Sequence, residues 1–227
     1  MNPLLSFLPL LFLSLQRTYA LWPQPSKLQT GTSALRLAPN TTFKITVDVD
    51  NPPADLLAAV QRTRVYLFTD DFARLVPSRG AEDLPALSHA NALPGLTLRL
   101  QAAGEGTGEG NGVVAREIAL EARTYILDRQ EGYMLNVPAD GTEAVLSAAS
   151  TLGLFRGLNT FAQLWYTYDC GKEALDKDGN SGDGPGVVVY TLSAPVAIQD
   201  SPAYVSLLSR RKRLCFLGML TWLWILL

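Results

Sequence analysis

The sequence predicts an α+β fold, in which a mixed sheet packs against two helices and no (β/α)8 barrel is present. Several short stretches alternate apolar and polar residues, as half-buried strands do, and two longer stretches repeat apolar residues every three or four positions, as helices do. Their order along the chain is strand, helix, strands, helix, strand, which suits a sheet covered by two helices. We expect one such domain over residues 43–204.

The first strand is expected at residues 43–49, after an extended lead-in. Residues 21–42 contain three prolines and scattered polar residues, so we expect little regular structure there. In "FKITVDV" every second residue is apolar, which predicts a strand with one face on the core. The run Asn51-Pro52-Pro53 should end this strand.

The first helix is expected to begin at Ala54 and to continue as far as Pro77, which cannot extend it. Its apolar residues fall near three, four and seven positions apart, so they would line one face. They are Leu56, Val60, Leu67, Phe68, Phe72 and Leu75.

The middle of the chain is expected to form a strand, a flexible loop and a hairpin. Every second residue is leucine in "LTLRLQ", residues 96–101, as in a strand. The stretch "GEGTGEGNG", residues 104–112, has glycine at five of nine positions and should be a flexible loop. "EGYMLNV" and "TEAVLSA" flank the turn dipeptide Asp140-Gly141, which predicts a β-hairpin.

A second helix is expected over residues 151–166, with Ser150 or Thr151 as its cap. Its apolar residues lie three or four positions apart: Leu152, Phe155, Leu158, Ala162 and Trp165. Gly153 and Gly157 would each lower helix stability by about 1 kcal/mol relative to alanine. We therefore expect close contact between this helical face and the sheet.

The last strand is expected in "GVVVYTL", residues 186–192, because a short apolar run is typical of a buried strand. Residues 194–202 contain two prolines and are expected to be an exit segment.

A secretory signal is predicted over residues 1–20. Leu4 to Leu15 form an apolar run that is too short for a bilayer, which needs about 20 residues. Small and polar residues follow it, so we expect cleavage after Ala20 and secretion of the mature chain. In a secreted chain Asn40-Thr41-Thr42 is a usable N-glycosylation sequon, for which an unmodified surface loop is the alternative.

The body of the chain is acidic. The chain has 19 basic and 21 acidic residues, and Arg17 and the run Arg210–Arg213 lie outside residues 21–204, which leaves 14 against 21, a net charge of −7. Such a surface repels phosphate backbones, so nucleic acid is not expected as a partner. Cys170 and Cys215 are too few for a disulfide framework.

Two loop motifs resemble ligand sites but lack necessary parts. Residues Gly110 to Ala115 match a dinucleotide-binding pattern, yet no strand leads directly into them, no helix clearly opens after them, and Glu105 and Glu109 would repel a pyrophosphate. "DKDGNSGDGPGV" begins like a calcium loop, but Ser181 replaces the required glycine and Val187 the closing glutamate. We therefore expect no cofactor and no metal.

No catalytic residue is predicted within the chain. His89 is the only histidine, so a zinc site with two histidines is excluded, and no G-x-S-x-G elbow is present for a serine nucleophile. The acidic pairs Asp70-Asp71 and Glu82-Asp83 are interpreted as solvated surface.

Four stretches resemble the N-terminal, non-catalytic domain of fungal β-N-acetylhexosaminidases of glycoside hydrolase family 20. They are "LWPQP", "GYMLNVPADGTEAVLSAAS", "TLGLFRGLNTFAQLW" and "VVYTLSAPVAIQDSPAY", which together extend from Leu21 to Tyr204. The resemblance implies that this domain packs against a catalytic (β/α)8 barrel, and that the whole secreted enzyme releases terminal N-acetylglucosamine or N-acetylgalactosamine from chitin fragments and glycans. The domain should then present apolar residues to the barrel.

The chemistry of that family requires segments that this sequence does not contain. The resemblance implies an Arg-Gly pair soon after "DSPAY" and a later His-x-Gly-Gly-Asp-Glu segment, whereas Val205-Ser206-Leu207-Leu208 follows here. A barrel needs about 250 residues, and only 23 follow Tyr204. We therefore expect the chain to be truncated before the barrel and inactive alone. A stand-alone secreted or membrane-anchored accessory or binding module is the alternative.

The tail, residues 205–227, is basic and then apolar. Leu214 to Leu227 would form a helix about 21 Å long at 1.5 Å per residue, short of the roughly 30 Å hydrocarbon core. We interpret the tail as out-of-frame translation or a lost splice junction, with a glycolipid-anchor signal or a membrane segment as alternatives. No membrane contact is expected except through Leu214 to Leu227.

Overall fold

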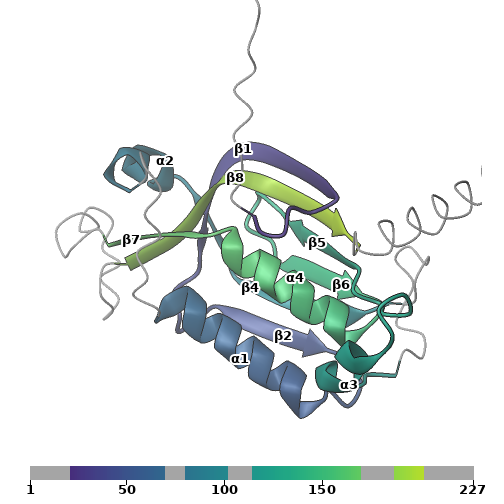
Figure 1. Ribbon diagram of the computed structural model, residues 1–227. Helices are drawn as coiled ribbons and strands as arrows, with labels where there is room; N and C mark the ends of the chain where they lie inside the picture. Colours follow the sequence, from purple (N-terminus) through teal and green to yellow (C-terminus); the bar gives the residue numbers. More distant parts are fainter. Residues whose placement is uncertain (1–20, 70–79, 102–113, 170–186, 202–227) are drawn as a thin grey trace, which may run out of the picture.

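The computed structural model describes residues 21–69, 80–101, 114–169 and 187–201 (Figure 1). The elements in chain order are β1 (Lys27–Leu37), β2 (Lys44–Asp48), α1 (Ala54–Phe68), the 3-10 turn η1 (Ala81–Asp83), α2 (Leu84–Leu87), β3 (Asn91–Leu93), β4 (Gly95–Leu100), α3 (Ile118–Arg123), β5 (Tyr133–Val137), β6 (Ala144–Ala148), α4 (Thr151–Gln163), β7 (Tyr166–Asp169) and β8 (Val187–Asp200). The predicted signal, the glycine-rich loop, residues 176–186 of the calcium-like loop, both cysteines and the tail lie outside the described residues.

The strands form one mixed sheet in the order β2-β4-β6-β5-β8-β1-β3, and β7 pairs with β8 off this path. β2, β4 and β6 run parallel, whereas β5 is antiparallel to both β6 and β8. Helices α1 and α4 lie side by side over one face of the sheet, and the other face carries no described helix (Figure 1). The predicted α+β architecture with two packing helices is confirmed, and no barrel is seen in the described residues.

Helix α1 buries the face that its apolar spacing predicts. Leu56, Ala59 and Leu67 are buried, and Val60 and Phe68 pack partly against the core. The helix is confirmed as far as Phe68. Residues 70–79, which complete the predicted helix, lie outside the described part of the chain.

Helix α4 is capped and packed as predicted. The Ser150 side chain accepts a hydrogen bond from the main-chain N–H of Gly153 at 3.0 Å. A Cβ on Gly153 would lie 2.5 Å from the carbonyl oxygen of Gly132, and one on Gly157 would lie 2.2 Å from Cδ1 of Leu146. The two glycines therefore allow the helix to approach the sheet more closely than side chains would permit.

The predicted hairpin is formed by β5 and β6, which pair in antiparallel register. Gly141 has a φ of 84°, a turn conformation that glycine adopts without strain. The amide and hydroxyl of Thr142 donate to Oδ1 of Asp140, and these hydrogen bonds hold the pKa of the Asp140 carboxyl below its ordinary value. The other predicted strands are confirmed as β2, β4 and the first half of β8.

The expectation of little regular structure in residues 21–42 is wrong. Lys27–Leu37 forms β1, which lies inside the sheet between β8 and β3. Its alternation is irregular because the β1–β8 register shifts twice. Its main partner also lies far away in sequence, with Lys27 opposite Gln199, so nothing local indicates the pairing.

The expected exit segment 194–202 is also wrong, because β8 continues through Pro195 to Asp200. Proline has no N–H for a sheet ladder and is normally confined to edges and bulges. Here it lies where the β1–β8 register is irregular. A Cβ on the facing Gly31 would lie 2.2 Å from the Ala194 carbonyl oxygen and 2.5 Å from Cδ of Pro195, so only glycine leaves room for the proline.

Smaller elements appear where loops or helix were expected. The loop before β4 contains η1, α2 and β3, and β3 pairs in parallel with β1. The second helix ends at Gln163 rather than at residue 166, and β7 then pairs with β8 in antiparallel register.

Candidate docking surface on the helical layer

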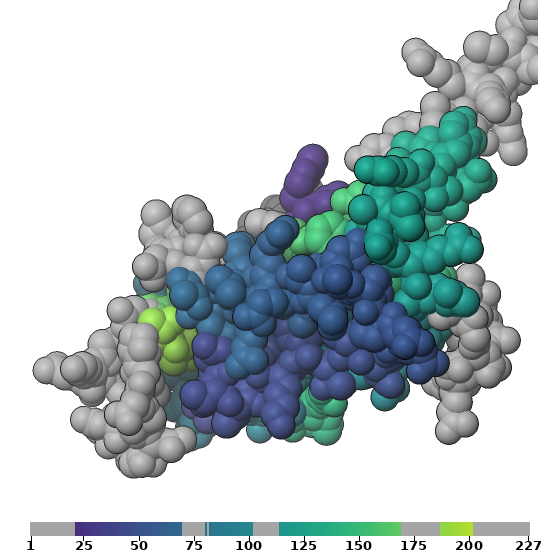
Figure 2. Space-filling view, turned by 90° about the horizontal axis from the view of Figure 1, so that it is seen from below, coloured from purple at the N-terminus to yellow at the C-terminus, as the bar shows by residue number. Residues whose placement is uncertain are grey.

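Helices α1, α3 and α4 and the exposed Trp22 form one continuous surface, which we call the helical layer. Asp55 of α1 accepts the main-chain N–H of Ala119 in α3 at 3.1 Å. Helix α1 packs along α4 over the sheet (Figure 1). In the view from below, α1 crosses the surface with the α3 segment at one end (Figure 2).

The N-terminal end of α4 is tied to α3 by Glu121. Its Oε2 accepts the main-chain N–H of Leu152 at 2.7 Å and lies 2.8 Å from the Thr151 hydroxyl. The Thr151 hydroxyl also lies within hydrogen-bonding distance of the carbonyl oxygen of Arg116. A carboxylate at a helix N-terminus satisfies free amides and is favoured by the helix dipole, so this contact fixes α3 on α4.

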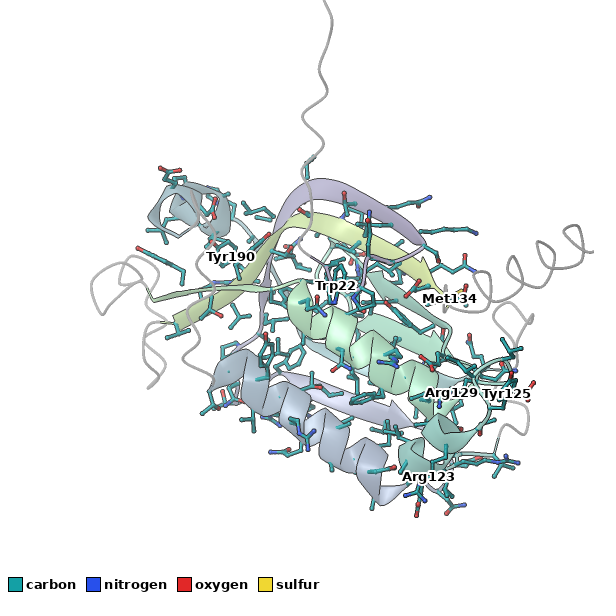
Figure 3. All side chains as sticks on the ribbon, in the orientation of Figure 1. Trp22, Arg123, Tyr125, Arg129, Met134 and Tyr190 are labelled. Carbon is teal, nitrogen blue, oxygen red and sulfur yellow. The ribbon has the colours of Figure 1, made fainter. Side chains whose placement is uncertain are left out.

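Trp22 is held at the opposite end of α4. Its main-chain N–H donates to Oε1 of Gln163 at 2.7 Å, and Nε2 of Gln163 donates back to the Trp22 carbonyl at 3.0 Å. The indole nevertheless remains 83% exposed. Figure 3 shows Trp22 near this end of α4, away from the α3 segment. The pair of hydrogen bonds fixes the backbone of an exposed tryptophan.

Most of the large apolar side chains exposed in the described residues belong to the helical layer or its flanks. They are Trp22, Leu57, Val65, Tyr66, Val114, Leu120 and Tyr125, exposed between 37% and 83%. Exposed apolar side chains gathered on one side of a molecule indicate a surface that is covered in the functional state. We therefore regard the helical layer as the candidate docking surface.

The open face of the sheet is mostly polar by comparison. The strand register brings a row of six residues across it: Asp48, Arg99, Ser147, Met134, Gln199 and Lys27. Arg99 and Asp48 form an ion pair at 3.1 Å, and Lys27 donates to Gln199 at 3.1 Å. Met134 is the only apolar side chain in this row, which suits a face in contact with water.

Charged and aromatic residues meet at the α3 end of the helical layer. Figure 3 shows Arg123, Tyr125 and Arg129 near one another in this region. Glu131 lies 3.0 Å from Arg156 of α4 and 3.7 Å from Arg129. The exposed Arg123 and Arg156 and the partly exposed Arg129 would form a polar rim beside the apolar side chains, the usual arrangement at a protein interface.

A buried hydroxyl pair connects α4 to the sheet. The hydroxyls of Tyr133 and Thr160 lie 2.6 Å apart. Burial raises the pKa of Tyr133, the hydrogen bond to Thr160 opposes this rise, and the nearby charge of Asp200 adds to it. The tyrosine therefore stays neutral at physiological pH and serves as a structural contact.

The residues considered for catalysis do not form a site. His89 and Glu82 are exposed, and Asp70-Asp71 lies outside the described residues. The interpretation of Glu82-Asp83 as solvated surface is wrong for Asp83, which is 8% exposed and accepts a hydrogen bond from the Tyr190 hydroxyl at 2.7 Å. No local pattern indicates this contact, because Tyr190 follows 107 residues later.

The structure describes the predicted glycosylation sequon and the end of the dinucleotide-like pattern. Asn40 is exposed in the loop between β1 and β2. Helix α3 does open three residues after Ala115, but it has only six residues and its N-cap is Glu117, which would repel a pyrophosphate.

No group of three metal-binding side chains occurs in the described residues. Among the same residues, no helix is both long and apolar enough to cross a membrane.

The comparison with protein families shows which family the chain belongs to. A model of the family described as beta-acetyl hexosaminidase like matches residues 21–164. The chain belongs to this family. The hexosaminidase resemblance is therefore confirmed at the level of the family, and the match ends just after α4, before β7 and β8. No curated protein matches the chain.

Solved structures of larger hexosaminidases are similar to this hexosaminidase-like chain. A Flavobacterium johnsoniae chitobiase is 19% identical with a TM-score of 0.41, and the match covers 80% of this chain and 20% of the chitobiase. A Bacteroides fragilis β-N-acetylhexosaminidase is 14% identical with a TM-score of 0.38, covering 81% and 25%. A Streptomyces plicatus N-acetyl-β-hexosaminidase is 23% identical with a TM-score of 0.35, covering 80% and 26%. The chain thus spans between 20% and 26% of these proteins.

Proposed function

We propose that residues 21–204 are the N-terminal, non-catalytic lobe of a secreted β-N-acetylhexosaminidase and that the helical layer packs against the catalytic barrel of that enzyme. The family match supports the hexosaminidase assignment. The observation that carries the docking role is the contrast between the two faces, since exposed apolar side chains gather on the helical layer while the open face is polar.

The lobe supplies support and no chemistry in this proposal. Its sequence contains no His-x-Gly-Gly-Asp-Glu segment to protonate a leaving group. Within the described residues, the buried acid Asp83 is engaged by Tyr190 in a structural contact. The hydrolysis of terminal N-acetylhexosamines from chitin oligomers or glycans would therefore belong to the barrel.

The energetics favour docking through α1. Covering a large aliphatic side chain fully gains about 1.5–3 kcal/mol relative to leaving it in water. Leu57 and Val65 are each about half exposed, at 46% and 47%, so a barrel that covers them gains part of this energy at each position. The hydrogen bonds of Asp55 and Glu121 hold the layer together before docking, which lowers the entropic cost of association.

Co-expression tests the docking role. The chain is expressed with a family 20 catalytic barrel whose own N-terminal lobe has been removed, and the complex is recovered through a tag on the barrel. We expect the wild-type chain to co-purify and Val65→Lys to reduce recovery at least tenfold, because lysine keeps the helix but places a charge in the apolar surface.

The matched control is Asn136→Lys, which adds the same charge to the exposed open face. This variant should co-purify like the wild type. Failure of the wild type to bind any barrel, or an equal loss for both variants, would contradict the docking role. Binding to an intact enzyme that keeps its own lobe would instead favour the accessory module.

A further inference from the structure

Asn40 lies at an exposed turn between β1 and β2. The main-chain N–H and the hydroxyl of Thr42 both bond back to the Pro39 carbonyl, at 2.8 Å and 3.1 Å. Asn40, Thr41 and Thr42 are all exposed. The turn therefore presents the whole Asn-x-Thr triplet to solvent, ahead of the edge strand β2.

Arg64 of α1 fixes the orientation of the Asn40 amide. Its Nε donates to Oδ1 of Asn40 at 3.1 Å, and its Nη2 donates to the Asn40 main-chain carbonyl at 2.5 Å. A guanidinium has donors and no acceptor, so the side-chain oxygen must face the arginine and the NH2 group must face away from it. Among the described residues, Nδ2 of Asn40 has no hydrogen-bond partner.

We propose that Asn40 carries an N-linked oligosaccharide on Nδ2, and that Arg64 orients the linkage by donating a hydrogen bond to Oδ1 of the same amide. Asn40-Thr41-Thr42 is the only Asn-x-Ser/Thr triplet in the 227 residues. In the transfer, Nδ2 attacks C1 of the first sugar of a lipid-pyrophosphate oligosaccharide. The C1–N bond forms, the C1–O bond to pyrophosphate breaks, and one amide proton is lost as the lipid pyrophosphate leaves.

The Arg64 contact is compatible with the modified side chain. After transfer the asparagine keeps its carbonyl oxygen, and only one of the two hydrogens on Nδ2 has been replaced. Both acceptors used by Arg64 therefore remain in place, while the sugar extends on the other side of the amide. The arginine acts as a positioning residue for the linkage and takes no part in the transfer.

The test is expression of the full chain in a eukaryotic secretory host, followed by peptide N-glycosidase treatment and mass mapping. Treatment should remove one glycan and convert Asn40 to aspartate. Thr41→Ala keeps the sequon and should keep the glycan, whereas Thr42→Ala and Asn40→Gln should both lose it. The site is excluded if the wild-type chain is recovered without glycan, whether from the medium or from inside the cells.

Arg64→Met tests the positioning role, because methionine keeps an apolar stem but has no N–H donors. The glycan should still be added in this variant. Its removal from the native protein should be several-fold faster than in the wild type, since the linkage is no longer held. Equal removal rates, or loss of the glycan in Arg64→Met, would overturn the role given to Arg64.

Discussion

Gly157 of α4 lies so close to Leu146 of β6 that a Cβ on the glycine would be 2.2 Å from the leucine Cδ1. One turn earlier, a Cβ on Gly153 would lie 2.5 Å from the carbonyl oxygen of Gly132. The intrinsic cost of the two glycines, about 1 kcal/mol each, is therefore offset by closer packing of the helix on the sheet.

Gly157→Ala and Gly153→Ala should both lower the free energy of unfolding, by about 1–3 kcal/mol, because overpacking outweighs the better helix propensity of alanine. The effect should be larger at Gly153, where the neighbour is a backbone carbonyl, than at Gly157, where a leucine side chain can rotate. Urea unfolding measures both. Asn159→Ala, at an exposed position of α4, is the control and should not destabilise.

The capping contacts of α4 should be measurable in the same way. Ser150→Ala removes the side-chain acceptor for the Gly153 amide and should cost about 0.5–2 kcal/mol. Glu121→Ala leaves the Leu152 amide without its charged acceptor and should cost about 1–3 kcal/mol. Glu117→Ala is the control, because Glu117 makes no side-chain cap hydrogen bond. An equal loss in all three variants would argue against specific capping.

Tyr190→Phe should loosen the segment from Gly80 to Leu93. The Tyr190 hydroxyl is buried, donates to Asp83 at 2.7 Å and accepts the Gly80 amide at 3.1 Å. Its loss should cost about 1–3 kcal/mol and should speed amide hydrogen exchange in that segment. Tyr125→Phe, which alters an exposed tyrosine, should leave the exchange unchanged.

The raised pKa of Tyr133 predicts a loss of stability in alkali. Below about pH 10, the ordinary tyrosine value, its hydroxyl is protonated in both states and its contribution is fully present. As the pH rises from there through the higher folded-state pKa, the unfolded chain gives up its proton first, so the free energy of unfolding falls.

Urea unfolding between about pH 9 and about pH 11 measures this fall in the wild type and in Tyr133→Phe. The phenylalanine variant starts from a lower stability because Thr160 loses its hydrogen bond to Tyr133 and keeps only the one to the Arg156 carbonyl, so the slopes are compared and not the absolute values. A shallower slope in the variant is expected, and identical slopes would contradict the assignment to Tyr133.

The sequence predicted the elements whose signals are local. The leucine alternation of β4, the capped repeat of α4 and the Asp140-Gly141 turn all depend on neighbouring residues, and all three are confirmed. Strand β1 and the second half of β8 were missed because their stability depends on pairing across the chain. Glycine and proline normally interrupt strands, so the sequence alone does not indicate that Gly31 faces Pro195. In the structure, the missing side chain of Gly31 leaves room for the proline ring.

The existence of an apolar docking surface was predicted, but the residues that form it were not. The resemblance implied apolar residues facing a barrel, but the apolar period of α1 indicates its buried side and not its exposed one. Leu57 and Val65 became distinguishable only once the sheet defined which face of α1 is covered. Asp83 was misjudged for a related reason, since its burial is set by a tyrosine from β8.

The most direct test of the central claim is the turnover of a chromogenic N-acetylglucosaminide by the purified chain. Because the family's catalytic Asp-Glu segment is absent from the sequence, we expect no release of chromophore above the enzyme-free blank at any pH or chain concentration. Release that scales with chain concentration and survives repurification would contradict the assignment of this chain as a supporting lobe.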